Sequence, residues 1–203
     1  MDKKTLRLVL ASPSDVQAER DSVSSVVEEV NRVIADLYNL RLEVYRWETD
    51  AFAGLHVEGG QGIIDQVLDI KSASIVVGIF WSRFGKKLSD GNTGTEHEIR
   101  WAIDSWKRTG SPQVMLYFCD KPVSPSSTDW EQAGAVQKFK KEFEPQGLYS
   151  VYDSLESFKD ELRKNLNIYI KNTYRNPPLP LRSKNPIRRG RIQGKYWNDI
   201  CNF

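Results

Sequence analysis

The chain has 203 residues, of which 39% are apolar and 28% charged, and its formal net charge is +2. These values suit one globular domain with an extension and exclude a disordered protein. The two cysteines, Cys119 and Cys201, supply no disulfide framework, and the isolated His56 and His97 belong to no metal-binding spacing. No segment approaches the roughly 18 consecutive apolar residues that a membrane helix needs. We therefore expect a soluble, cytoplasmic protein that binds no metal.

Strand and helix patterns alternate along the first 175 residues. Apolar or alternating runs predict strands at residues 6–12, 40–47, 73–81, 113–119 and 147–153. The first is followed by a long predicted helix, with apolar residues at Val23, Val26, Val27, Val30, Val33, Ile34 and Leu37. Further helices are predicted at residues 60–71, from Thr95, at 129–146 and at 154–174. This order predicts a doubly wound α/β fold, a flavodoxin-like parallel sheet of five strands with helices on both faces.

One strand of this sheet is expected at its centre. The run from Ser74 to Phe80 is apolar almost without interruption, which is typical of a strand buried on both faces. The sequence therefore predicts that this strand has neighbours on both sides.

Residues 176–203 differ from the rest of the chain. They contain four prolines and no amphipathic period, and they carry six Lys or Arg residues against one acid. We therefore expect an α/β domain over residues 1–175 and a Pro-rich basic tail or linker over 176–203. Such basic runs can contact nucleic acid or acidic lipid but are more often only solvated, so nucleic acid is not the expected partner.

Candidate ligand-binding residues gather at the predicted carboxyl ends of the strands. In a doubly wound sheet, ligands bind at that edge, near the point where the winding direction reverses. Aromatic rings there could stack on a base, and the N–H groups of a helix start could bind an anion. The candidates for substrate binding are Ser12, Ser14 and Asp15 after the first strand, Trp47 and Glu48 after the second, Trp81, Arg83 and Phe84 after the third, and Gly94 and Thr95 at a helix start. Each also has a structural interpretation, as a packing residue, a helix cap or part of a turn.

Two glutamates, Glu96 and Glu98, lie in the stretch GNTGTEHEIRWAID, residues 91–104. We expect both in the first turn of a helix, where the backbone N–H groups and the helix dipole favour an ionised Glu98 by about 0.3 to 1 kcal/mol. Thr95-x-x-Glu98 also has the spacing of a capping box, in which each side chain binds the other residue's free backbone N–H. This structural role does not exclude a second, chemical role.

Three motifs, LASPSDVQAERDSV, GIFWSRFGKK and GTEHEIRWA, together resemble a TIR-like domain family of unknown function over residues 5–170. That family is found in bacteria, often as the first module of larger proteins. More distantly, Asp90, Gly94-Thr95-x-x-Glu98 and Ala102 resemble the pattern of nucleoside deoxyribosyltransferases, in which this glutamate is the nucleophile. TIR domains that cleave NAD carry a glutamate on the equivalent helix. The resemblances imply Glu98 as the catalytic residue, with Glu96 as the register-shifted alternative.

The resemblances imply an N-glycosidase, most directly one that hydrolyses NAD to nicotinamide and ADP-ribose in bacterial defence or stress signalling. NAD would be the substrate, and no cofactor is expected. One carboxylate is sufficient, because nicotinamide leaves as a neutral molecule and needs no general acid. Glu98 would either stabilise the ribosyl cation or form a covalent intermediate with it. With a nucleoside as substrate, Asp90 or Glu96 could protonate the departing base.

A second class of function stays open. Many TIR domains are scaffolds, so the chain could be a non-enzymatic signalling module that self-associates or binds a larger defence or signalling protein. For an enzyme of this kind too, self-association is expected, because TIR-like enzymes commonly assemble to complete the site.

Overall fold

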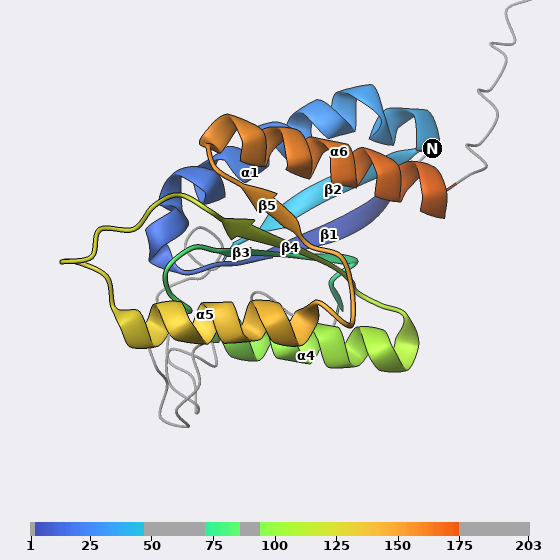
Figure 1. Cartoon of the computed structure of the whole chain (residues 1–203). Coiled ribbons are helices and arrows are strands. Elements are labelled where there is room, and N and C mark those ends of the chain that lie inside the picture. Colours follow the sequence, from blue (N-terminus) through green and yellow to red (C-terminus); the bar gives the residue numbers. More distant parts are fainter. Residues whose placement is uncertain (1–2, 47–71, 86–93, 175–203) are drawn as a thin grey trace, which may run out of the picture.

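The computed structural model describes residues 3–46, 72–85 and 94–174 (Figure 1). Five strands form one sheet: β1 (Lys4–Ala11), β2 (Leu40–Tyr45), β3 (Ile75–Phe80), β4 (Gln113–Cys119) and β5 (Ser150–Tyr152). All neighbouring strands are parallel, and their order is β2-β1-β3-β4-β5. This is the flavodoxin-like order of a doubly wound α/β fold. The predicted fold class is confirmed, and so is the central position of β3.

The helices cover both faces of the sheet. They are α1 (Gln17–Val33), α4 (Gly94–Thr109), α5 (Trp130–Phe143) and α6 (Leu155–Thr173), with short 3-10 turns η1 (Ser14–Val16) before α1 and η2 (Ala35–Tyr38) after it. Figure 1 shows α1 and α6 against one face, and α4 and α5 against the other. The helix predicted at 60–71 and the tail predicted over 176–203 lie outside the described residues.

The helix after β1 is shorter than predicted. α1 ends at Val33, and the chain then passes through η2 and Asn39 before entering β2. Asn39 has a φ of 56°, the left-handed conformation that asparagine tolerates better than most residues, and it turns the chain toward the sheet. The expectation that Val33 and Leu37 continue the apolar stripe is therefore wrong, and both side chains are 64% exposed.

The sheet separates two apolar cores, and β3 contributes to both. Its six residues are all buried, and successive side chains point to opposite faces. Ile75, Val77 and Ile79 pack toward α1 and α6, whereas Val76 and Phe80 pack toward α4 and α5. Gly78 lies where a Cβ atom would come within 2.8 Å of Ile99 Cδ1 on α4. The continuous apolar run predicted from the sequence thus has a packing partner on each side.

None of the helices in the described part of the chain is both long and apolar enough to cross a bilayer.

Candidate functional site

The carboxyl ends of β1 and β3 adjoin at the point where the winding of the sheet reverses. From β1 the chain crosses through α1 to β2 on one side, and β3 lies on the other side of β1. α1 starts near this point on one face of the sheet, and α4 starts near it on the other (Figure 1). The starts of the two helices therefore flank the edge at which doubly wound proteins bind ligands.

A buried pair of opposite charges spans this edge. Arg20, in the first turn of α1, is 5% exposed, and Glu98, near the start of α4, is 7% exposed. Burial is the main influence on the guanidinium of Arg20 and lowers its pKa, and Arg46 lowers it further, whereas Asp21 and Glu98 raise it. Glu98 thus lies close enough for its charge to act on Arg20, although the two helices pack on opposite faces of the sheet.

Arg20 also joins the segment after β1 to the end of β2. Its Nη1 atom donates to the carbonyl oxygen of Pro13 over 3.5 Å, and its own carbonyl oxygen accepts from Arg46 Nη1 over 3.4 Å. Arg46, just after β2, also lies 3.8 Å from Asp21 Oδ1. Two guanidinium groups and several acids therefore lie together at the carboxyl ends of β1 and β2.

Asp15 ties the loop after β1 to the loop after β3. Its Oδ2 atom accepts hydrogen bonds from the backbone N–H and the hydroxyl of Ser82, both over 2.9 Å. Gly85 lies beside this junction with a φ of 110°, a conformation that favours glycine. A Cβ atom on Gly85 would lie 3.7 Å from Pro13 Cβ and 3.9 Å from Thr95 Oγ1. The segments after β1 and β3 and the start of α4 thus converge, as predicted from the topology.

Ser12 contributes a buried polar group to the same place. It is 7% exposed, and within the part of the chain that the structure describes its hydroxyl has no hydrogen-bond partner. A buried hydroxyl without a partner costs free energy, so a ligand that bonded to it would recover that cost. Ser12 is therefore the predicted binding residue whose local surroundings best suit a ligand.

A second group of polar residues lies next to the first, toward β4. Lys121 Nζ donates to Oε1 of Glu19 over 3.0 Å, and Glu19 is only 4% exposed. The carbonyl oxygen of Lys121 accepts from Trp81 Nε1 over 3.0 Å, which fixes the indole ring after β3. Cys119 ends β4 beside them, and burial is the main cause that raises the pKa of its thiol.

The two candidate glutamates face different surroundings. Glu96 Oε1 accepts from Arg100 Nε over 2.8 Å, and Arg100 in turn binds Glu142 of α5 over 3.1 Å. Glu98 is instead buried and acts on Arg20 of α1. Two residues apart on a helix means nearly opposite directions, so Glu98 and not Glu96 faces the carboxyl edge of β1.

The predicted capping box is wrong. α4 begins at Gly94, so Thr95 is its second residue and cannot be the cap that precedes the helix. Glu98 is the fifth residue of α4 and lies beyond the first turn, where the helix dipole acts most strongly. Glu98 interacts instead with the charge of Arg20 on α1.

The remaining predicted residues have mixed positions. Phe84 is 2% exposed, and its ring packs edge-on against Phe80 and Phe139, so it is a core residue rather than a stacking surface. Ser14 is exposed, whereas Trp81, Arg83 and Gly94 are half-buried. The predicted residues Trp47, Glu48 and Asp90 lie outside the described residues.

Sequence reasoning missed several polar residues at this edge: Glu19, Arg20, Arg46, Ser82 and Lys121. A signal for Arg20 was present, because it lies four residues after Val16 and three before Val23, on the apolar stripe of α1. A charged residue on a stripe that faces the core is a candidate for a buried ion pair. In the described ranges, no group of three His, Cys, Asp or Glu side chains could hold a metal ion.

Comparison with known proteins identifies the domain family but gives no activity for it. A family model described as a domain of unknown function (DUF4062) matches residues 11–167, from the end of β1 into α6. No curated protein matches the chain.

Proposed function

We propose that the chain, which belongs to the DUF4062 family, is a TIR-like N-glycosidase that hydrolyses NAD to nicotinamide and ADP-ribose. The observation that carries this proposal is the burial of Glu98 beside Arg20 at the carboxyl edge of β1 and β3. Burying a charge costs far more than burying an apolar side chain, and charged pairs of this kind gather at functional sites. The edge itself is where this fold binds nucleotides and other ligands.

The reaction needs one carboxylate and one water molecule. The bond between C1′ of the ribose and N1 of the pyridinium breaks, and its electron pair returns to N1, so nicotinamide leaves neutral. The ribosyl group becomes an oxocarbenium-like cation, which the carboxylate of Glu98 stabilises by charge or captures as a covalent ester. Water then bonds to C1′ and loses a proton, and where an ester has formed its bond to Glu98 breaks and the carboxylate is released, which gives ADP-ribose.

Arg20 supports this role by keeping Glu98 in place as an anion. A carboxylate buried alone would carry a large desolvation penalty, which a neighbouring guanidinium offsets. The hydrogen bonds from Arg20 to the Pro13 carbonyl and from Arg46 to the Arg20 carbonyl hold α1 against the loops of the site. Arg20 is thus a positioning residue, because in this proposal it acts through Glu98.

Ser12 and Trp81 are the described residues assigned to substrate binding. The unpartnered hydroxyl of Ser12 would bond to a phosphate or ribose oxygen, and the half-buried Trp81 would stack on a base. Asp15 is assigned to holding the two loops together through Ser82. The TIR-like relationship, a role in bacterial defence or stress signalling, and self-association rest on the motif resemblance.

The competing function is a signalling module without activity. The same two buried charges favour it in one respect, because opposite charges on two helices can serve only to stabilise the fold. The two functions differ in whether Glu98 has to be a carboxylate that reacts, and a single substitution separates them.

The test is nicotinamide release from NAD at high protein concentration, because an enzyme that must self-associate would be inactive when dilute. Glu98→Gln should lower the rate at least about a hundredfold, which corresponds to about 2.7 kcal/mol of activation free energy. Glu96→Gln, the matched control on the same helix, should change it only about threefold or less. Melting curves identify a variant that has lost its fold. Release that persists unchanged in Glu98→Gln contradicts the assigned residue, and no release by the concentrated wild type favours the signalling module.

A further inference from the structure

The outer edge of β4 is covered over only part of its length. β4 has seven residues, but β5 pairs only with Tyr117, Phe118 and Cys119. Over residues 113–116, β3 lies on one side, and no strand of the described chain lies on the other. An uncovered strand edge presents backbone N–H and C=O groups in a row that another strand can pair with.

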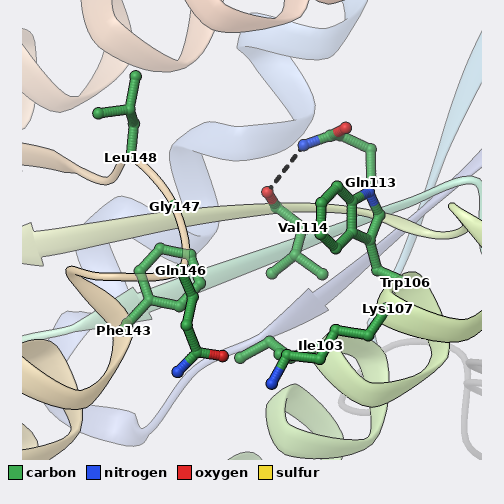
Figure 2. A pocket seen from close by; sticks show the side chains of 9 residues that line it. All are labelled: Ile103, Trp106, Lys107, Gln113, Val114, Phe143, Gln146, Gly147 and Leu148. Atoms are coloured by element: carbon green, nitrogen blue, oxygen red, sulfur yellow. Dashed lines mark hydrogen bonds between the residues drawn. The ribbon is translucent and has the colours of Figure 1, made fainter.

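Val114 provides the backbone groups that face this open edge. The N–H of Gln113 donates to the carbonyl oxygen of Ser74 over 3.0 Å, which directs Gln113 toward β3. Successive residues of a parallel strand bond to opposite sides, so the N–H and C=O of Val114 point outward. Its carbonyl oxygen accepts from the side chain of Gln113 over 3.1 Å, the dashed bond in Figure 2.

A cavity opens beside this edge on each face of the sheet. Figure 2 shows the first, of about 260 Å³, with Trp106 of α4 and Phe143 of α5 on either side of Val114 and the side chain of Leu148 pointing away from it. The second has a volume of about 600 Å³ and lies on the side of α6. Gln113, Val114 and Leu148 line both cavities. Because side chains of a strand point alternately to opposite faces, a strand added here would direct them into the two cavities in turn.

Three large apolar side chains around the edge are exposed. Leu148 is 96% exposed, Ile168 of α6 is 48% exposed and Trp106 is 44% exposed. Exposed apolar side chains that gather in one region mark binding sites on soluble proteins. These side chains belong to the linings of the two cavities, so their exposure and the open edge form one surface.

The charges of this surface favour an occupant with a carboxylate. Lys107 lines the first cavity and makes no ion pair within the ranges that the structure describes. In the second cavity, by contrast, Lys164 is paired with Glu161 over 2.9 Å. The cation that an incoming ligand can neutralise is therefore on the side of α4.

We propose that residues 113–116 of β4 bind an extended peptide segment of a partner protein, which adds a strand to the sheet. Its apolar side chain enters the cavity between Trp106, Val114 and Phe143, and an acidic side chain beside it pairs with Lys107. Backbone bonds to Val114 supply the affinity, and the alternating cavities supply the selectivity. A second copy of the chain is the alternative occupant, and the oligomeric state of the free chain tests it.

The test uses the whole chain labelled with ¹⁵N and a capped seven-residue peptide in which valine or leucine alternates with threonine, with a glutamate at one end. Addition of this peptide should shift the signals of Val114, Leu148 and the Trp106 indole in a saturable way. It should also slow hydrogen exchange of the Val114 amide at least about tenfold. Methylation of alternate backbone nitrogens, which removes the peptide's hydrogen-bond donors, should weaken binding at least about tenfold.

Substitutions locate the binding surface. Leu148→Asp and Trp106→Ala should each weaken the peptide at least about tenfold, whereas Val151→Asp, equally a change of an exposed apolar residue but on β5, should not. Four results would overturn the proposal: no saturable shift at millimolar peptide, equal binding of the methylated peptide, a Val114 amide already protected in the free monomer, or a free dimer that shields Val114. None of these readouts depends on Glu98 or on NAD.

Discussion

The two ends of the sheet differ in which side chains they bury and which they expose. At the carboxyl end, Glu19, Arg20 and Glu98 are each no more than 7% exposed, so charges are buried. At the amino end of β4, the apolar side chains of Leu148 and Trp106 are exposed. Folding alone favours the reverse arrangement, apolar groups inside and charges outside. Each end therefore departs from what stability requires, and each departure suits a different ligand: a small charged molecule at one end and an apolar peptide at the other.

The largest difference between the ends should appear when a cation is removed from each. Arg20→Met leaves the carboxylate of Glu98 buried without its cation and should lower the free energy of unfolding by about 3 to 5 kcal/mol. Lys107→Met, the matched change at the amino end, should stay within about 0.5 kcal/mol. Urea unfolding of both variants measures the two effects, and equal losses would remove the contrast.

A double-mutant cycle shows whether the effect of Arg20 passes through Glu98. Arg20→Met combined with Glu98→Gln should be less destabilised than the sum of the single variants by about 1 to 3 kcal/mol. Strict additivity would mean that the two residues contribute independently. This measurement stands even if the protein proves to be inactive toward NAD.

The junction between the loops at the carboxyl end should be the next largest effect. Asp15→Ala removes the acceptor of both Ser82 bonds and should cost about 2 kcal/mol, whereas Ser82→Ala removes only the hydroxyl bond and should cost about 1 kcal/mol. Thermal unfolding compares them. Losses of equal size would show that the backbone N–H bond of Ser82 contributes nothing.

A smaller effect of pH should also come from the carboxyl end. Burial raises the pKa of the Cys119 thiol above its ordinary value of 9.0, which is the value expected in the unfolded chain. Its contribution to stability is therefore complete below about pH 9 and is lost as the pH rises through the folded-state pKa. Melting temperatures should fall as the pH rises above about 9, and less so in Cys119→Ala. Burial also raises the pKa values of Tyr117 and Tyr152. The wild type and Cys119→Ala should therefore both lose stability at still higher pH.

The smallest expected effect lies at the amino end. Leu148→Asp changes a side chain that is 96% exposed and should alter the free energy of unfolding by no more than about 0.5 kcal/mol. Leu116→Ala, in the same groove but 2% exposed, should cost about 2 to 5 kcal/mol. A large loss in Leu148→Asp would mean that this side chain supports the fold and is not reserved for a partner.

The fold could be predicted from the sequence because its signals are local. The apolar run of β3 and the alternation of strands and helices determine the layers and the order of the sheet. The predictions that failed depended on where helices start and stop: Thr95 lies inside α4, and Val33 ends α1, so both lost the role that their spacing suggested. Such bounds depend on loop geometry, which residue spacing does not record.

The candidate site could be predicted only in part. The topology indicated the carboxyl edge and drew attention to Ser12, Asp15 and Glu98, because parallel strands end together. It could not show that the charge of Glu98 acts on Arg20, since the two residues belong to different helices on opposite faces of the sheet. Phe84 was misassigned for a related reason, because a half-polar loop sequence does not show which ring turns into the core.

Gly78 in β3 leaves room for side chains of β4 and α4 to pack against the central strand. A Cβ atom there would come within 2.7 Å of Leu116 Cδ2 and 2.8 Å of Ile99 Cδ1, and Ile99 is the residue after Glu98. A larger residue would require both of these flexible side chains to move. The absence of a side chain at Gly78 thus lets Leu116 and Ile99 pack against the backbone of the central strand, next to the helix turn that carries Glu98.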